Sequence, residues 1–243
     1  MNARGFTLVE MIATIVIGSF IMLGIAGYVQ LGMKGYADSI DRQRLQTQAQ
    51  FVLEKMSREI RHAVPNSFYE PNGTTNCLAF VPIEYSGFYT LNGQDLEFLL
   101  GNDTARTVMP KDSWLVINPS RYDDLLPSSP QSYSVSLLSK DDGVFKVNGA
   151  ADSIDSSSIS SRHYVYQESA QITYCLDNNQ VTRQDAAFPD PVIVAENVDT
   201  AASRMYYKEP TLQRGGLVHI NLEFVQDGER SVYQQDVQVL NVP

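Results

Sequence analysis

The sequence predicts an α+β fold in which one long N-terminal α-helix packs on an antiparallel, β-rich globular head. Three observations carry this prediction. Residues 11–33 form an uncharged apolar run, an amphipathic stretch follows over 34–64, and short apolar runs between turn residues fill 65–243. The first pattern is long enough for a membrane-spanning helix, the second has the helical period, and the third is typical of strands.

Composition and charge narrow the class of protein. The chain has 243 residues, of which 43% are hydrophobic, so it can bury a core and is not a wholly disordered chain. Its 18 basic and 28 acidic side chains give a net charge of −10. Residues 34–64 are net +2 and the rest of the chain beyond them is net −12. Because phosphate binding needs clustered Lys and Arg, nucleic acid is not an expected partner. With three histidines and two cysteines, we expect no metal and no cofactor.

The apolar run at 11–33 is the first element. As a helix of 23 residues it spans about 34 Å, against about 30 Å for the hydrocarbon core of a bilayer. This length indicates a membrane anchor or a secretory signal. Glu10 lies at its edge, where burial in hydrocarbon costs about 2.5–3.5 kcal/mol, and such a residue is a functional candidate. A signal peptide places its charges before the apolar run, so conventional cleavage after residues 24–26 is disfavoured. Such cleavage would leave a secreted periplasmic binding protein or enzyme.

The residues Arg4-Gly5-Phe6-Thr7-Leu8-Val9-Glu10, followed by the uncharged run, resemble the class III leader of type IV prepilins and type II secretion pseudopilins. The resemblance implies that prepilin peptidase removes residues 1–5 by cutting after Gly5 on the cytoplasmic side. Phe6 then becomes the N-methylated amino terminus. It also implies a single pass through the bacterial inner membrane, with residues beyond Lys34 in the periplasm.

Cleavage gives Glu10 a defined chemical role. The new ammonium of Phe6 lies four residues before Glu10, and an assembling neighbour can offer its own ammonium to this carboxylate. Each charge is costly alone in an apolar filament core, whereas a pair offsets much of that cost. We therefore expect Glu10 to set axial register during assembly. Many family members have proline where this chain has Gly27; Gly24 and Gly27 weaken the helix less strongly, so local unwinding remains open.

The second element is the amphipathic helix of residues 34–64. Its apolar positions recur at helical spacing and form one stripe: Leu45, Ala49, Val52, Leu53, Met56, Ile60, Ala63 and Val64. Glu54 and Arg58 stand at i and i+4 on the polar face. Pro65-Asn66 stops the helix. Joined to the apolar part, residues 6–33, it forms one helix of roughly 59 residues, or about 88 Å.

The third element is the head, residues 65–243. The strands that the sequence predicts there are 77–84, 96–100, 114–118, 134–138, 164–167, 171–176, 181–183, 192–195, 204–208, 218–225 and 232–241. Residues 177–180 and 226–229 mark two hairpin turns. In the second hairpin, Val218, Ile220, Leu222 and Phe224 form one apolar face, and we expect Val232, Val237 and Val239 to join it. Residues 122–132 and 150–162 are predicted loops.

Cys77 and Cys175 are the only cysteines, each in a predicted strand. Two free buried cysteines are possible, but an oxidising periplasm favours a disulfide. It would close a loop of about 98 residues, for which chain entropy predicts a stabilisation of about 4.7 kcal/mol.

We expect no enzyme, because no GxSxG, HExxH, P-loop or GxGxxG motif occurs and the three histidines are scattered. The aromatic groups at Tyr85, Phe88 and Tyr89, and at Tyr206 and Tyr207, could stack on sugars, although packing within a sheet is the commoner use.

Residues 51–67, Cys77 and the closing Asn241-Val242-Pro243 narrow the resemblance to the MshO type of minor pilin from the mannose-sensitive haemagglutinin (MSHA) pilus. This resemblance implies a subunit that incorporates at or primes the pilus tip and supports assembly. Its implied partners are other minor pilins, the major pilin, prepilin peptidase, the inner membrane and its assembly platform. One alternative is a J-type pseudopilin of a type II secretion system, and a second is a tip adhesin that binds a surface ligand.

Overall fold

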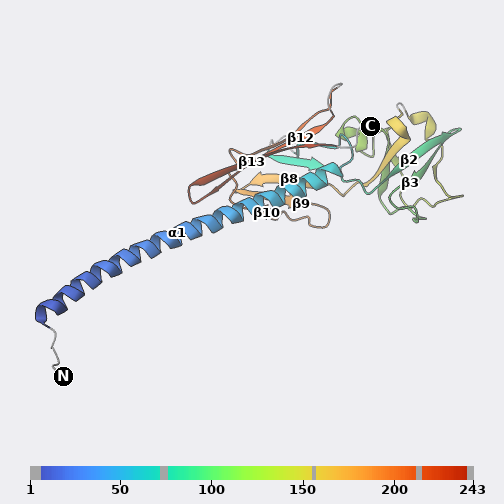
Figure 1. The fold of residues 1–243 in the computed structure, drawn as a ribbon. Helices are drawn as coiled ribbons and strands as arrows, with labels where there is room; N and C mark the ends of the chain where they lie inside the picture. Colours follow the sequence, from blue (N-terminus) through green and yellow to red (C-terminus); the bar gives the residue numbers. More distant parts are fainter. Residues whose placement is uncertain (1–6, 72–75, 155–156, 212–214, 240–243) are drawn as a thin grey trace. The chain divides into compact units, whose positions relative to one another are not determined.

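The structure, a computed structural model, describes residues 7–71, 76–154, 157–211 and 215–239. The chain forms two compact units, residues 1–48 and 49–243. One helix, α1 (Leu8–Arg61, 54 residues), is followed by an all-antiparallel set of strands (Figure 1). The predicted α+β class, with a long N-terminal helix and an antiparallel β-rich head, is confirmed.

Helix α1 ends earlier than the sequence predicts. Its last residue is Arg61, because the chain then leaves the helical path to pair with the strand region of the head. Ala63 forms an isolated antiparallel bridge with Pro82, and the Val64 amide donates to the carbonyl of Val81 at 2.8 Å. Asn66 has a φ of 58°, a left-handed conformation that Asn tolerates and that turns the chain away. The predicted helical boundary at Val64 is therefore wrong by three residues.

Within the second unit, the end of α1 supplies one side of the core. Ala49, Val52, Met56 and Ile60 are each 0% exposed. Their spacing of three or four residues places them on one helical face, as the apolar stripe predicts. The Glu54–Arg58 pair lies on the wet face at 3.5 Å, with both side chains largely exposed.

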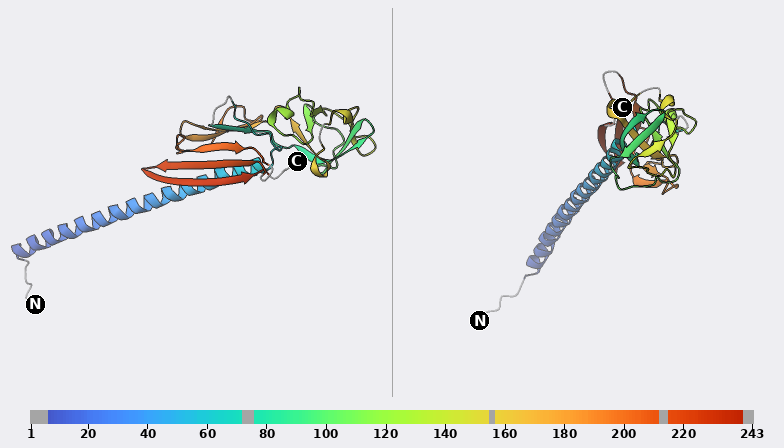
Figure 2. Two further views of the ribbon diagram at one scale, coloured as in Figure 1. Left: turned by 90° about the horizontal axis from the view of Figure 1, so that it is seen from above. Right: turned by 90° about the vertical axis from the view of Figure 1, so that its right-hand side faces the viewer.

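Two sheets lie near this end of the helix. The first has the order β1-β8-β9-β10 and the second the order β11-β12-β13, and β1 also contacts β11. Their strands are β1 (Cys77–Phe80), β8 (Ile172–Asp177), β9 (Gln180–Gln184), β10 (Val192–Ala195), β11 (Arg204–Lys208), β12 (Leu217–Gln226) and β13 (Glu229–Gln238). Figure 2 shows β12 and β13 as a long hairpin.

The third sheet is built entirely from the chain between β1 and β8. Its order is β5-β4-β7-β2-β3-β6, from β2 (Tyr85–Asn92), β3 (Asp95–Leu100), β4 (Ser113–Val116), β5 (Ser132–Ser134), β6 (Phe145–Val147) and β7 (Arg162–Gln167). Three short 3-10 helices join these strands: Tyr122–Leu125, Ala151–Ser153 and Ile159–Ser161. This sheet has its own apolar cluster, with Leu96, Phe98, Leu115 and Phe145 almost fully buried.

Most predicted strands are present, although several differ in their bounds; β13, for example, begins at Glu229 where the sequence predicts a strand over 232–241. The predicted strand 77–84 is too long: β1 ends at Phe80, and β2 begins at Tyr85, beyond the predicted range. Strands β2 and β6 were not predicted as separate elements, and β5 covers Ser132–Ser134 where the sequence predicts a strand over 134–138. The predicted loop at 122–132 contains a 3-10 helix, and the one at 150–162 contains two.

The hairpin face is confirmed except at one residue. Val218, Ile220, Leu222, Phe224 and Val237 are 0% exposed, but Val232 is 54% exposed. Val232 and Val237 are five positions apart, and residues an odd number apart point to opposite faces of a strand. The expectation that Val232 joins the buried face was therefore wrong.

Candidate functional site

The candidate site is the start of α1, where Glu10 lies in the first helical turn. Thr7 precedes the helix and exchanges hydrogen bonds with it. The Glu10 amide donates to Thr7 Oγ1 at 3.4 Å, and the Thr7 amide donates to Glu10 Oε2 at 3.5 Å. This is a capping box, in which the two residues bond each other's backbone amides reciprocally. The Glu10 amide also donates to the Thr7 carbonyl at 3.1 Å. Both bonds lie at the long limit of hydrogen-bond geometry, so the carboxylate is only weakly held.

The capping role is one that the sequence analysis missed. The Thr-x-x-Glu spacing is a recognised signal for a helix start and could have predicted it. Glu10 is exposed, and its negative charge sits at the positive end of the helix dipole. The structure thus places an accessible carboxylate at the start of α1, where it caps the helix.

The helix surface beyond Glu10 is apolar on all sides. Every large apolar side chain from Leu8 to Met33 is exposed, with fractions from 47% to 80%. An 18-residue stretch of α1 has a mean hydropathy of 2.3, and none of this stretch is buried. By length and composition, α1 can therefore cross a membrane. Gly24 and Gly27 lie inside the helix, and an added Cβ at either would meet no atom within 4 Å. A surface of this kind fits membrane anchoring, since water would not solvate it.

The predicted cleavage and methylation residues, Gly5 and Phe6, lie outside the described residues. Their processing, and the register role of Glu10, stay predictions.

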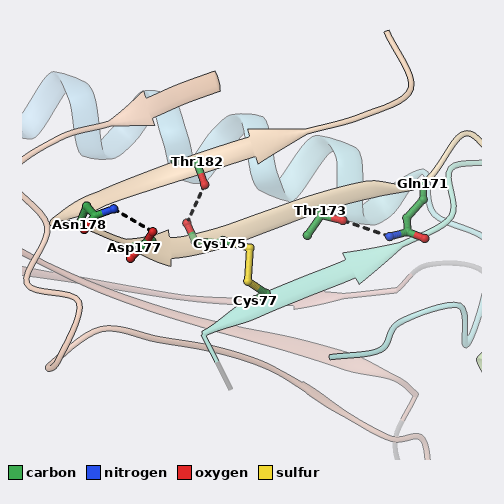
Figure 3. The surroundings of a disulfide bond; sticks show 7 residues. All are labelled: Cys77, Gln171, Thr173, Cys175, Asp177, Asn178 and Thr182. Carbon is green, nitrogen blue, oxygen red and sulfur yellow. Dashed lines mark hydrogen bonds between the residues drawn. A yellow bond between two sulfur atoms is a disulfide. The ribbon is translucent and has the colours of Figure 1, made fainter. Parts of the chain in front are cut away.

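The predicted disulfide is present between Cys77 and Cys175 (Figure 3). The two residues are directly opposite one another in the β1–β8 ladder. Thr182 on the next strand donates its hydroxyl to the carbonyl of Cys175 at 3.5 Å. The bond joins β1, which precedes the six-stranded sheet in the chain, to β8, which follows it. It therefore links the two ends of the segment that forms this sheet.

A partly buried charge network links α1 to the β8–β9 pair. Glu59 accepts hydrogen bonds from Tyr174 Oη at 2.7 Å, Arg183 Nε at 3.1 Å and Lys55 Nζ at 3.0 Å. Arg183 also pairs with Asp185. Burial raises the pKa of Glu59, but the three hydrogen bonds outweigh it and hold that pKa below its ordinary value. Tyr174 and Arg183 are 115 and 124 residues from Glu59, so no local sequence signal could have found this network.

The aromatic residues considered as a sugar platform do not gather on one surface. Tyr85 and Tyr89 are buried, whereas Phe88 is exposed. Tyr207 stacks on Phe68 at 4.8 Å between ring centroids and donates its hydroxyl to Asn66 Oδ1 at 2.9 Å, so it holds the turn after α1. Of Tyr206 and Tyr207, only Tyr206 faces outward. Its ring centroid lies 5.1 Å from that of His219.

The scattered histidines stay apart in the structure. His163 is fully buried against Phe98, and burial lowers its pKa to about 3 against a smaller opposing effect of the Phe88 backbone. His219 pairs with Asp236 at 2.6 Å on the hairpin. Across the described parts of the chain, no group of three or more His, Cys, Asp or Glu side chains is arranged to hold a metal ion.

Comparison with known proteins gives one finding. Residues 1–26 match the family model of the prokaryotic N-terminal methylation motif. No curated protein and no solved structure matches the chain. The match supports a type IV pilin-like class III leader and, with it, a pilin-like or pseudopilin-like subunit. Proteins that carry this motif serve structural roles and are not catalysts.

Proposed function

We propose that this chain is a minor type IV pilin of the MSHA type, which incorporates at or primes the pilus tip and supports pilus assembly. The observation that supports the proposal is that the methylation motif and the apolar helix are continuous in the chain. The methylation motif of residues 1–26 runs directly into α1, whose apolar part is exposed on every side. Such a surface requires another apolar environment, which a membrane supplies before assembly and neighbouring helices supply afterwards.

Processing prepares the helix for assembly in this proposal. Prepilin peptidase cuts after Gly5, and Phe6 becomes a methylated terminal amine. In the membrane-bound subunit, Glu10 caps its own helix through Thr7. During assembly the ammonium of a neighbouring subunit approaches Glu10. Because the hydrogen bond from the Thr7 amide is long, the carboxylate exchanges it for a charge pair at little cost, and this pair fixes the axial position of the incoming subunit.

The proposal also assigns a location and partners. The head lies in the periplasm while α1 anchors it in the inner membrane. Other minor pilins, the major pilin and the inner-membrane assembly platform are the assembly partners. The Cys77–Cys175 disulfide suits an oxidising compartment outside the cytoplasm.

Three variants of the full-length chain separate the register role of Glu10 from its capping role. Glu10→Gln keeps a hydrogen-bond acceptor for the cap but removes the charge. Thr7→Val removes the side-chain half of the capping box, the Oγ1 acceptor of the Glu10 amide, but keeps the Thr7 amide and the Glu10 charge. Glu10→Val removes both the charge and the side-chain acceptor. We expect E10Q and E10V to be processed and inserted yet absent from sheared pili, and T7V to assemble as the unmodified chain does.

The assay is immunoblotting of membranes and sheared surface fractions from a strain that lacks the chromosomal copy. Normal incorporation of E10Q contradicts the register role. Loss of T7V as severe as that of E10Q indicates that an intact capping box is needed as well, so the charge alone does not explain incorporation. Mass measurement of the mature protein checks that it begins at Phe6.

A J-type pseudopilin would share the same leader, helix and head. The deletion strain distinguishes the two functions, because a minor pilin is needed for surface pili and a pseudopilin for protein release into the medium. Normal piliation with a loss of secreted proteins would replace the pilin proposal with the pseudopilin one.

A further inference from the structure

Strand β13 is an unusual sheet edge. The other outer strands of the three described sheets are short: β1 and β10 have four residues, β5 and β6 three, and β11 five. In addition, a register irregularity between Ile193 and Ala195 interrupts β10. By contrast, β13 has ten residues, and its ladder with β12 is unbroken over ten pairs.

An edge of this kind normally carries protection against pairing with another chain. Proteins shorten edge strands, bulge them, or place Pro and Lys on them. Strand β13 contains neither Pro nor Lys, and its central residues 231–235 are uncharged. The charges of β13 lie toward its two ends, at Glu229, Arg230 and Asp236. A long, regular edge with an uncharged centre is a template for strand addition, in which main-chain hydrogen bonds supply the affinity.

The exposed face of β13 is complementary to itself. Arg230, Val232, Gln234 and Asp236 alternate along the strand and are all exposed. In an antiparallel pair of two β13 strands centred on Tyr233, Arg230 of each copy faces Asp236 of the other, and Val232 faces Gln234. Opposite charges on facing positions stabilise a strand pair, and like charges destabilise it.

Other arrangements lose this match. A parallel pair in register places Arg230 beside Arg230, and an antiparallel pair shifted by two residues no longer places Arg230 opposite Asp236. Arg230 already pairs with Glu223 and with Asp199 at 3.5 Å, and Asp236 Oδ1 lies 2.6 Å from His219 Nδ1. Their side chains remain 61% and 57% exposed, and a guanidinium has five donors, so each can accept a further partner.

We propose that β13 is a docking edge for a second copy of this chain, which pairs antiparallel about a two-fold axis at Tyr233. The pairing joins the two three-stranded sheets into one continuous six-stranded sheet. The contact is isologous, since the same residues serve on both copies, and it closes as a dimer. It involves the head alone and stands independently of the pilin proposal.

Cysteine cross-linking of the full-length protein in detergent micelles tests the register. The described residues contain no free cysteine, so introduced thiols report without background from them. Mixed V232C and Q234C chains should form an intermolecular disulfide, because facing residues of paired strands lie about 4.5–5.5 Å apart between Cα atoms. V192C on the bulged edge β10 is the matched control, since Val192 is 46% exposed and Val232 is 54%.

Charge reversal tests the same contact without cysteines. R230D or D236R creates two like-charge pairs per dimer and should weaken dimerisation about tenfold, whereas the double variant R230D/D236R should restore it. Near-ultraviolet circular dichroism, which includes the Phe224 and Tyr233 rings packed together in the hairpin itself, verifies that each variant is folded.

The proposal is supported when V232C and Q234C cross-link more strongly with each other than either does alone or with V192C. It is overturned by equal yields at all three positions, which indicate association through α1. Failure of the double reversal to restore dimerisation, with all variants folded, also overturns it.

Discussion

Removing the charge of Glu59 is the sharpest perturbation of the contact between α1 and the β8–β9 pair. In Glu59→Gln the shape is kept, but the charge-assisted hydrogen bonds from Arg183 and Lys55 are lost and a side-chain amide faces the guanidinium. The Glu59 and Arg183 side chains are only 19% and 14% exposed, so solvent replaces little of this interaction. We expect the free energy of unfolding to fall by about 2–4 kcal/mol at pH 7.

The same substitution predicts a pH dependence. The pKa of Glu59 is lower in the folded state than its ordinary value of 4.5. The folded state therefore binds the proton less readily than the unfolded state. The stabilisation is complete above about pH 4.5 and is lost as the pH falls through the folded pKa. The gap between the unmodified protein and E59Q is largest at pH 7 and closes under acid conditions.

Urea unfolding of the full-length protein in mild detergent measures this gap, with the fluorescence of the only tryptophan, Trp114, as the signal. Glu54→Gln is the matched control, because Glu54 lies one turn away in the largely exposed pair with Arg58. It should change the free energy by less than about 0.5 kcal/mol. An E59Q effect as small as that of E54Q, or a gap that stays constant to pH 3, would refute the reasoning.

Three further perturbations test the head. Replacing Cys77 and Cys175 by serine should cost about 2–5 kcal/mol in the same urea assay, because the bond spans 98 residues; an unchanged midpoint would contradict this. Gly87→Ala should cost about 1–3 kcal/mol, since its Cβ would lie 1.8 Å from the Leu99 carbonyl oxygen; normal stability would show that β2 and β3 can separate freely. The pKa of His163 is about 3 when folded and about 6.5 when unfolded, so stability should fall as the pH drops from 6.5 toward 3. H163F should flatten that fall between pH 7 and 5, and parallel curves would exclude His163 as its source.

The sequence predicts those elements whose signals are local. The buried face in the second half of α1 follows from apolar side chains three and four residues apart, although the helix ends three residues earlier than predicted. The β12–β13 hairpin follows from alternation on both sides of a turn. Strand β2 lacks such a signal, because Gly87 interrupts it and its packing depends on a close approach to Leu99. Val232 is apolar, but it lies an odd number of residues from Val237, so the alternation of the strand places it on the exposed face.

The residues of the candidate site also differ in how far the sequence predicts them. The leader, Glu10 and the two cysteines are visible in the sequence because each is a short motif or a rare residue. The Glu59 network depends on side chains more than 100 residues apart, which only the folded chain brings together. The capping bond between Thr7 and Glu10 has a local signal, the Thr-x-x-Glu spacing, and is therefore predictable from the sequence.

The Cys77–Cys175 bond bears on how the head withstands mechanical pulling. Tension that enters along the backbone from α1 reaches Cys77 and crosses two sulfur atoms to Cys175, so the intervening polypeptide is bypassed. The six-stranded sheet lies outside this covalent path and carries none of the tension along it. Its weaker strands can be extended, exchanged or varied without lowering the force at which the subunit as a whole gives way.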